Sequence, residues 1–409
     1  MHILALCLAL TAAPQGPPAA DPLFRANGLD GSTALGRLRA LSADGRATLI
    51  GPDGASIDVP AFFKLTRVGE PIGPDGPRDE PYASPVAGPM ALLPEGDRLR
   101  GEVGAVGETA VEVTPSWSAD APLALPIDAV LGLILSPPAE PEARAALAAR
   151  VRDEPREADA LWLTNGDRLA GGFLELTARR AKIQLAAGPS EVDRAGVAAL
   201  GLDPRVARYP APPADLVELT LADGSRLGVS ACRVERGHVE ATTRPGPAVK
   251  IPLGAIARVH LRGDRVRYLS GREAQAGYEG YLGTPRPYRR DRSAEGQPIR
   301  VGGQPYDRGL GVAARTLLAY RLEARDRRFQ ATVGLDDRAG PRGSVGFRVL
   351  VDRVERLSTP PMSARDRPLA VDIDISGAKL LVLIAEFADH AEVRDLADWA
   401  EARLVGTGP

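Results

Sequence analysis

The stretch that decides the fold is Leu163-Thr-Asn-Gly-Asp-Arg-Leu-Ala-Gly171, because near copies of it recur along the chain. The clearest copy is Leu93-Pro-Glu-Gly-Asp-Arg-Leu-Arg-Gly101, and fainter ones are Leu29-Asp-Gly-Ser-Thr-Ala-Leu-Gly36 and Leu221-Ala-Asp-Gly-Ser-Arg-Leu-Gly228. A glycine in such a turn supplies the positive φ that a tight hairpin needs. The sequence therefore predicts four β-repeats, each begun by a hairpin.

The residues after each turn complete the pattern of a small β-module. An alternating apolar run comes first, and a second apolar segment, often introduced by proline, closes the unit, as in Leu125 to Leu135 and Ile251 to Leu261. Five short strands in so few residues are typical of a strongly bent barrel. The pattern resembles SH3-like and Sm-like barrels. We therefore expect a mainly β protein, with several small SH3/Sm-like barrel repeats followed by a jelly-roll β-sandwich.

Shifts in composition give the domain boundaries. One helix is predicted, over the Ala-rich residues 142–152 between prolines. The expected units are a signal peptide at 1–20, β-repeats at 27–70, 90–136, 159–203 and 214–262, a helical linker at 137–158, and a β-sandwich at 268–407.

The overall composition excludes several classes of protein. The chain has 44 Gly and 37 Pro in 409 residues, which disfavours long helices. Its net charge of −2 and its few aromatic residues do not indicate a protein that binds nucleic acid. The apolar run Ile3 to Ala13 is too short to span a membrane and fits a signal peptide, with a buried strand as the alternative. We expect a secreted, periplasmic or cell-surface protein without a membrane span.

The last third of the chain has longer alternating strands and five ordered motifs. They are Gly302-Gly-Gln-Pro-Tyr-Asp-Arg-Gly-Leu-Gly-Val312, Arg328 to Asp337, Gly343 to Val349, Val371 to Leu380, and Asp395-Leu-Ala-Asp-Trp-Ala-Glu-Ala-Arg-Leu404. In this order they resemble the NPCBM family of carbohydrate-binding modules. The resemblance implies a non-catalytic β-sandwich that binds terminal, galactose-type sugars, in some members with a structural calcium ion.

Two positions depart from the family pattern. The family usually has histidine where this chain has Ala313, and again where it has Leu396. If the two positions are neighbours, the sugar pocket is remodelled here; a structure that places them far apart would remove this hypothesis.

Most of the candidate carbohydrate-binding residues have a structural alternative. Trp399 offers a flat face for stacking on a pyranose ring, but a core position is the alternative. Asp336 and Asp337 fit sugar hydroxyls or a calcium ion, or simply end a strand in a turn. The other candidates are a polar rim of Asp395 and Asp398, and the loop residues Tyr306 and Arg308, whose alternative is an ordinary connecting loop.

These observations predict an exported, non-catalytic protein that binds glycans or polysaccharide, with the repeats as spacers or as surfaces for protein partners. No catalytic residues are expected, because no nucleophile elbow, phosphate loop or metalloprotease motif occurs. The rival hypothesis is an extracytoplasmic protein-interaction scaffold with a degenerate sugar site. A third is a glycoside hydrolase or an accessory to one. A basic run that includes Arg289 and Arg290 around Tyr288 suits an anionic polysaccharide or a solvated loop.

Overall fold

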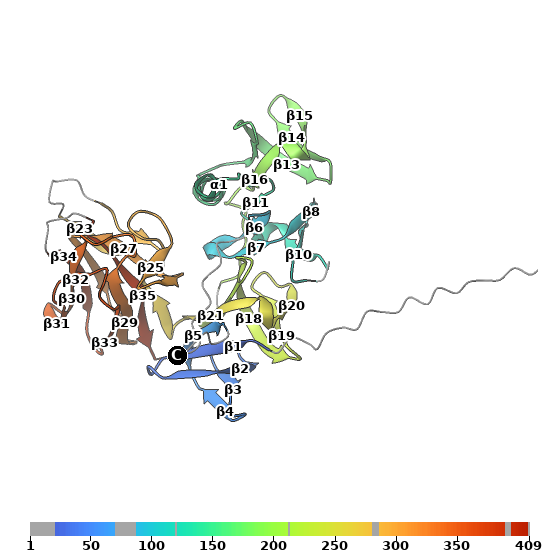
Figure 1. The fold of residues 1–409 in the computed structure, drawn as a ribbon. Helices are drawn as coiled ribbons and strands as arrows, with labels where there is room; N and C mark the ends of the chain where they lie inside the picture. The colour runs from blue at the N-terminus through green and yellow to red at the C-terminus, as the bar shows by residue number, and fades with distance from the viewer. Residues whose placement is uncertain are drawn as a thin grey trace, which may run out of the picture.

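The computed structural model describes residues 21–69, 87–118, 121–211, 213–279, 286–388 and 394–407. The predicted signal peptide at 1–20 lies outside these residues. The chain is mainly β, as expected, with the sandwich on one side and the repeats in a column beside it (Figure 1). No helix in the described part of the chain is long and apolar enough to cross a membrane.

The four repeats share one strand order, except that two short strands of the second repeat, β7 and β8, take the place of one longer strand in the others. The first contains β1 (Leu23–Gly28), β2 (Thr33–Leu41), β3 (Ala47–Ile50), β4 (Ser56–Val59) and β5 (Phe62–Val68). The second contains β6 (Met90–Leu92), β7 (Arg98–Arg100), β8 (Glu102–Val106), β9 (Ala110–Thr114), β10 (Leu123–Pro126) and β11 (Gly132–Ile134). The third contains β12 (Asp159–Leu163), β13 (Arg168–Leu176), β14 (Arg180–Leu185), β15 (Gly188–Asp193) and β16 (Val197–Gly201). The fourth contains β17 (Asp215–Leu221), β18 (Arg226–Glu235), β19 (His238–Thr243), β20 (Ala248–Pro252) and β21 (Ile256–Gly263).

Glycine has two roles in these repeats. The turn glycines adopt positive φ, for example 95° at Gly166. The second glycine of the motif lets neighbouring strands approach closely, since a Cβ at Gly171 would lie 2.1 Å from the carbonyl oxygen of Gln184. These two backbone requirements explain why both glycines recur in the copies of the motif. Within the described residues, however, β4 pairs only with β3, so hydrogen bonding does not close the first repeat into the expected barrel.

The repeats associate in pairs through their closing strands. In one pair β5 lies antiparallel to β21, with Leu65 opposite Val259. In the other pair β11 lies antiparallel to β16, with Leu133 opposite Leu200. The first repeat is therefore joined to the fourth, and the second to the third. We call these the 1–4 pair and the 2–3 pair.

The predicted helix is α1 (Pro141–Asp153), and it covers one face of the 2–3 pair. Leu147 and Val151 of α1 pack with Ile134 of β11, Ala199 of β16 and Trp162 of β12 in one buried apolar cluster. The corresponding face of the 1–4 pair is covered by the sandwich instead.

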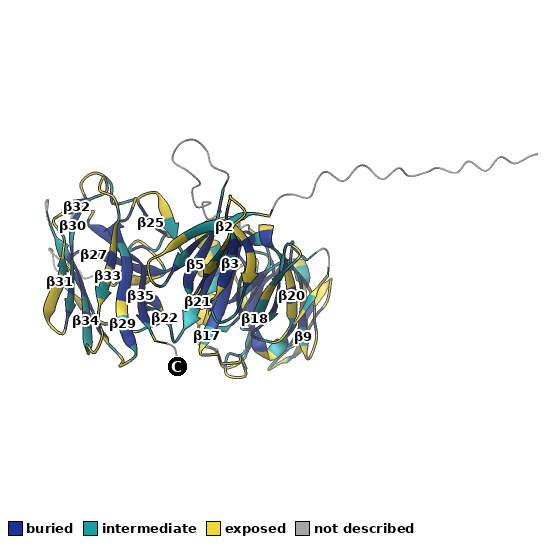
Figure 2. Cartoon of the chain, turned by 90° about the horizontal axis from the view of Figure 1, so that it is seen from below, coloured by how far each residue is buried: buried dark blue, intermediate teal, exposed yellow. Residues whose placement is uncertain are grey.

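The sandwich consists of two antiparallel sheets of six strands each. One contains β22 (Val266–Tyr268), β24 (Arg289–Arg290), β27 (Gly309–Ala313), β29 (Asp326–Leu335), β33 (Leu369–Asp374) and β35 (Leu396–Gly406). The other contains β23 (Gln275–Tyr278), β28 (Thr316–Arg321), β30 (Ser344–Val351), β31 (Val354–Ser358), β32 (Met362–Ser363) and β34 (Leu380–Phe387). A short hairpin, β25 (Ile299–Val301) with β26 (Gln304–Tyr306), lies outside both sheets. Strand β35 is buried almost throughout (Figure 2), because its sheet meets the core on one face and the repeats on the other.

Candidate functional site

The loop that carries Tyr306 and Arg308 docks the sandwich onto the repeats. Arg308 is 5% exposed, and its Nη2 donates to the two carboxylate oxygens of Glu218 at 2.8 and 2.6 Å. Glu218 lies on β17 of the fourth repeat and is 1% exposed. Arg308 is thus held as an interdomain anchor, which corrects the expectation that it binds sugar in the intact chain.

Glu218 is the centre of this docking site. Besides Arg308 it contacts Arg226 Nε at 3.0 Å and Arg262 Nη1 at 2.7 Å. Burial by itself would raise the pKa of Glu218, but the charges of Arg226 and Arg262 outweigh burial and lower the pKa to about 2. The carboxylate therefore stays ionised at neutral pH, as a buried anion among three guanidinium groups.

Further charged contacts surround this centre. Lys64 of β5 pairs with Glu401 of β35 at 2.6 Å, and its Nζ lies 5.8 Å from the centroid of the Tyr306 ring. Arg258 of β21 pairs with Asp307. Tyr306 is therefore part of the same docking site rather than of an open ligand surface. We refer to these contacts together with the Glu218 cluster as the docking site.

A buried histidine completes the docking site. His260 of β21 is 1% exposed. Burial lowers the pKa of its imidazole to about 4, and this effect outweighs the nearby carboxylates, which favour the protonated form and raise the pKa. Its imidazole is neutral at pH 7. The two repeat pairs thus cover equivalent faces by different means, the 2–3 pair with the apolar residues Leu147 and Val151 of a helix and the 1–4 pair with charged contacts.

Ala313 and Leu396 are direct neighbours. They are opposite residues where β27 pairs with β35, and they are 7% and 2% exposed. Two histidines at these positions would face each other across the strands. The structure therefore agrees with the hypothesis of a remodelled pocket. In that hypothesis, Ala313 and Leu396 occupy two neighbouring positions at which the family pattern has histidines.

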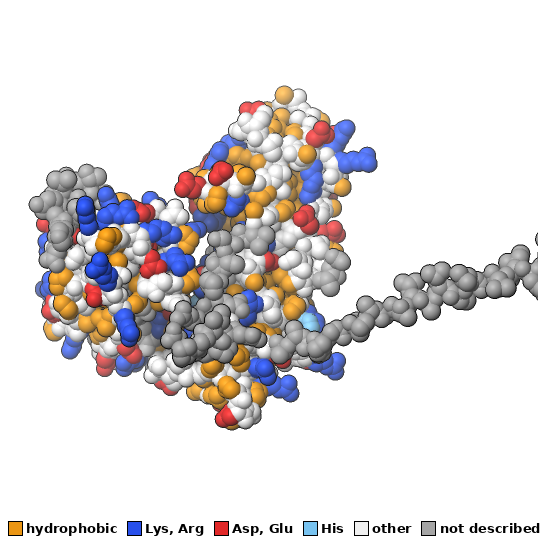
Figure 3. Space-filling view, in the orientation of Figure 1, with side chains coloured by type: hydrophobic (Ala, Val, Ile, Leu, Met, Phe, Trp, Pro, Cys, Tyr) orange, Lys and Arg blue, Asp and Glu red, His pale blue; other side chains and the backbone are white. Residues whose placement is uncertain are grey.

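Two tyrosines lie near this spot, Tyr278 at the end of β23 in the opposite sheet and Tyr288 just before β24. Tyr278 is opposite Thr316 where β23 pairs with β28, and its hydroxyl accepts a hydrogen bond from the Tyr288 backbone N–H at 3.3 Å. Tyr288 directly precedes β24, which pairs with β27, and its hydroxyl accepts from Arg290 Nη2 at 3.2 Å. Both rings are half-buried, while Arg290 is exposed. Basic side chains gather over β23 and β27 in Figure 3. We call Tyr278, Tyr288 and Arg290, with Ala313 and Leu396, the loop end.

The candidate aspartates do not form a polar rim. Asp336, Asp395 and Asp398 are 1%, 2% and 0% exposed. Asp395 accepts a hydrogen bond from the Ser344 backbone N–H at 2.9 Å and so orders a connecting loop. Asp337 accepts from the Gly303 backbone N–H at 3.1 Å, which ties the β25–β26 turn to the end of β29. The contact of Asp337 is the turn role that was the alternative to sugar binding for Asp336 and Asp337.

The carboxyl groups of Asp336 and Asp398 lie next to each other. Burial raises the pKa of Asp398 well above its usual value, and the neighbouring Asp336 raises it further. Asp398 shares a hydrogen bond with Asp336, and its side-chain oxygens have no other hydrogen-bond partner among the described residues. Calcium requires six to eight oxygen ligands. The described residues contain no group of three or more acidic, His or Cys side chains able to hold a metal. The residues present therefore do not fit the calcium site expected at Asp336 and Asp337.

Trp399 is a core residue. It is 1% exposed and lies edge-on to Phe347, with ring centroids 5.3 Å apart, and 6.3 Å from Phe329. Its indole fills the space between the two sheets and presents no face to solvent. This corrects the interpretation of Trp399 as a stacking platform for sugar.

The docking site was missed at the level of sequence, although a signal for it exists. Arg258, His260 and Arg262 alternate with Val259 and Leu261 along one strand. Such alternation gives one polar face, which is ordinarily a solvated face. Only the tertiary structure shows that this face is covered by another domain.

Comparison with known families identifies the C-terminal part of the chain. Residues 265–405 match the NPCBM/NEW2 domain. The match confirms the resemblance seen in the ordered motifs, and it covers the sandwich from β22 to β35. The repeats before the NPCBM domain lie outside it.

Among curated proteins, a protein of Renibacterium salmoninarum provisionally named an endo-alpha-N-acetylgalactosaminidase is 26% identical over 139 residues, which are 32% of this chain and 9% of that protein. Among solved structures, the CBM51 module of Clostridium perfringens GH95 in complex with methyl-galactose is 25% identical, with a TM-score of 0.32 and coverage of 34% of this chain and 99% of that module. The CBM51-2 and INT domains of Clostridium perfringens ZmpB, in complex with GlcNAc, are 22% identical, with a TM-score of 0.32 and coverage of 44% and 40%.

Proposed function

We propose that this is an exported, non-catalytic carbohydrate-binding protein whose NPCBM domain binds terminal, galactose-type sugars at the loop end. The observation that carries the proposal is the pair of half-buried tyrosines, Tyr278 and Tyr288, beside the spot where Ala313 faces Leu396. A tyrosine offers an apolar ring and a polar hydroxyl, the combination that contacts a sugar ring and its hydroxyls. The apolar run at residues 3–13 supports export.

A non-catalytic role agrees with the burial of the carboxylates. Glycosidases need two carboxyl groups that reach the scissile bond and a water molecule. Asp336 and Asp398, which face each other, are 1% and 0% exposed, so neither contacts solvent. The repeats would then hold the NPCBM domain in a fixed position, since the docking site attaches this domain to the 1–4 pair.

The test is a glycan array probed with the full chain, with and without calcium. We expect binding to terminal galactose-type glycans, and a loss of about fivefold or more in affinity for Tyr288→Ala, because a stacked aromatic contributes on the order of 1 kcal/mol or more. Arg356→Ala is the matched control, since Arg356 is exposed on β31 of the opposite sheet. A silent array contradicts the proposal.

The second candidate function is the protein-interaction scaffold. It is favoured by the docking of Tyr306 and Arg308 against the repeats, which removes two candidate ligand residues from solvent. The loss of polar groups at Ala313 and Leu396 points the same way. A silent array combined with capture of one defined protein partner by the full chain would support the scaffold.

A further inference from the structure

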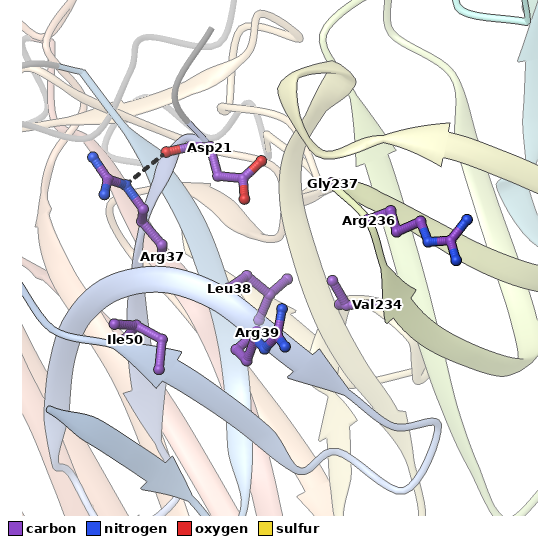
Figure 4. A pocket seen from close by; sticks show the side chains of 8 residues that line it. All are labelled: Asp21, Arg37, Leu38, Arg39, Ile50, Val234, Arg236 and Gly237. Atoms are coloured by element: carbon purple, nitrogen blue, oxygen red, sulfur yellow. Dashed lines mark hydrogen bonds between the residues drawn. The ribbon is translucent and has the colours of Figure 1, made fainter. Parts of the chain in front are cut away.

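The cavity between the first and fourth repeats does not bring its charged groups together. Its volume is about 280 Å³, and its lining includes Asp21, Arg39 and Arg236. Figure 4 shows the Arg236 side chain directed away from Arg39 and Asp21. The feature that points to a partner is instead the outer face of one sheet of the NPCBM domain, on the side away from the repeats (Figure 1).

Strand β34 of this sheet is apolar on both of its faces. Leu381 and Leu383 belong to the core of the sandwich. Val382 and Ile384 alternate with them along the strand and so face outward, where an antiparallel sheet with one face in water usually carries polar residues. Val382 is half-buried and Ile384 is 8% exposed, although neither belongs to the core cluster.

The neighbouring strands extend this apolar surface. Leu317 of β28 lies opposite Ile384 and is 38% exposed, and Leu350 of β30 lies opposite Val382. On the other side of Leu317 is Gly277 of β23, which has no side chain to cover it. Monomeric proteins rarely expose a contiguous apolar surface without a function for it. The outer patch, as we call this surface, consists of Leu317, Ala319, Leu350, Leu380, Val382 and Ile384.

Ion pairs form one border of the outer patch, from the loop end across to β31. Arg315 contacts Glu279 and Glu386, both at 2.9 Å. Arg348 contacts Glu386 at 3.2 Å and Glu355 at 2.6 Å. Three carboxylates thus share two guanidinium groups, so this border carries an excess of negative charge.

The opposite end of the sheet is positive. Arg321 at the end of β28, Arg353 in the β30–β31 turn and Lys379 just before β34 are exposed, and within the described part of the chain none of them has an ion-pair partner. Asp352, the carboxylate at this end, accepts from the backbone N–H groups of Lys379 and Leu380 at 3.0 and 2.9 Å. The face therefore complements a copy of itself whose strands run the other way.

The size and chemistry of this face suit a second sheet better than a sugar. Strands lie about 4.8 Å apart and rise about 3.4 Å per residue, so five strands of about six residues cover about 500 Å² in projection. Side chains add relief, which brings the accessible area to the order of the ~800 Å² that each partner buries in a stable interface. Among the described residues no aromatic ring lies on this face, so a sugar ring has nothing to stack on.

We propose that the outer patch binds the outer patch of a second copy of this chain, face to face and with the strands of the two copies running in opposite senses. Two sheets pack in this way in a β-sandwich, with their apolar side chains between them. The carboxylate-rich border of each copy then meets the cationic end of the other. The two loop ends lie at opposite ends of this dimer, which, if the proposed sugar site is correct, suits a protein that joins two glycan chains.

The test is analytical ultracentrifugation of the full chain over a range of concentrations, in which we expect a monomer–dimer equilibrium. Leu317→Glu should raise the dimer dissociation constant at least about a hundredfold, because a two-fold interface buries the new charge twice. Arg321→Glu should raise it about fivefold, because an exposed contact is lost at two symmetric positions. Leu369→Glu is the matched control, since Leu369 is 37% exposed but lies on β33 of the other sheet, and it should leave the equilibrium unchanged.

Several outcomes overturn the proposal. A chain that is monomeric at every concentration refutes the dimer, even if it captures a different protein through Leu317. A dimer that survives Leu317→Glu, with an unfolding midpoint equal to that of the wild type, uses another surface. A dimer unaffected by Arg321→Glu refutes the reversed arrangement of the strands. The dimer does not depend on sugar binding, so a monomer that still binds galactose overturns this inference alone.

Discussion

Replacing Glu218 by glutamine removes the one negative charge at the centre of the docking site. Arg226, Arg262 and Arg308 then remain together without their shared anion, although the side chain keeps its size. Removing one partner of a buried ion pair costs about 3–5 kcal/mol. The pKa of Glu218 gives an independent figure: its fall from 4.5 to about 2 corresponds to about 3 kcal/mol in favour of the ionised form. We therefore expect Glu218→Gln to lose about 3 kcal/mol of unfolding free energy.

The assay is urea unfolding at pH 7 followed by circular dichroism, with limited proteolysis to report separation of the NPCBM domain from the repeats. Glu355→Gln is the matched control. Its partner is Arg348 at 2.6 Å on the surface, with both side chains more than a third exposed, and exposed pairs contribute less than about 1 kcal/mol. If Glu218→Gln costs no more than Glu355→Gln and the domains stay protected from protease, the docking site does not hold the domains together.

Further predictions concern pH and packing. Because the pKa of Glu218 is lowered, its contribution to stability should be complete above pH 4.5 and disappear as the pH falls toward 2, and a urea midpoint that stays constant over this range would contradict it. The pKa of His260 is lowered to about 4, so the unfolded chain takes up its proton first. Stability should therefore decline by about 3 kcal/mol as the pH falls from 6.5 to 4; His260→Gln should remove that part of the pH profile, and an unaltered profile would show that the imidazole is not buried. Trp399→Ala should cost about 3–5 kcal/mol in thermal or urea unfolding, as for other buried aromatics, whereas a loss below about 1 kcal/mol would place the ring at the surface. The Arg194 guanidinium donates hydrogen bonds to the backbone carbonyls of Val103 and Thr177, so Arg194→Ala should destabilise the 2–3 pair by about 1–3 kcal/mol and speed hydrogen exchange in β8 and β13. Unchanged exchange in these strands would show that the Arg194 hydrogen bonds do not hold them together.

The local chemistry of the repeats could be predicted from sequence. Turn glycines such as Gly166 and close-approach glycines such as Gly171 are required by backbone geometry within a few residues, so each copy of the motif marks a hairpin. The helix at 142–152 and the order of motifs in the sandwich followed in the same way. Closure into barrels did not follow, because it depends on pairing between strands that are distant in the chain. The closing strands β5 and β21 pair with each other instead.

The candidate site was harder to predict, because the same side chains serve burial and binding. Trp399 and Asp398 have the chemistry of a sugar site, yet both are buried in the sandwich. Arg308 lies in a loop whose polar sequence predicts exposure to solvent. Its partner Glu218 is ninety residues away in the chain, so the contact that buries Arg308 leaves no local signal. The hypothesis about Ala313 and Leu396 did survive, since it concerned only whether two strand positions are neighbours.

The most direct test of the central claim is a crystal structure of the full chain soaked with a methyl galactoside. Sugar density at the loop end, with the ring against Tyr288 and hydroxyl groups within hydrogen-bonding distance of Tyr278 or Arg290, is the predicted result. Density at another surface of the NPCBM domain, or a loop end without sugar at saturating concentration, would contradict the account.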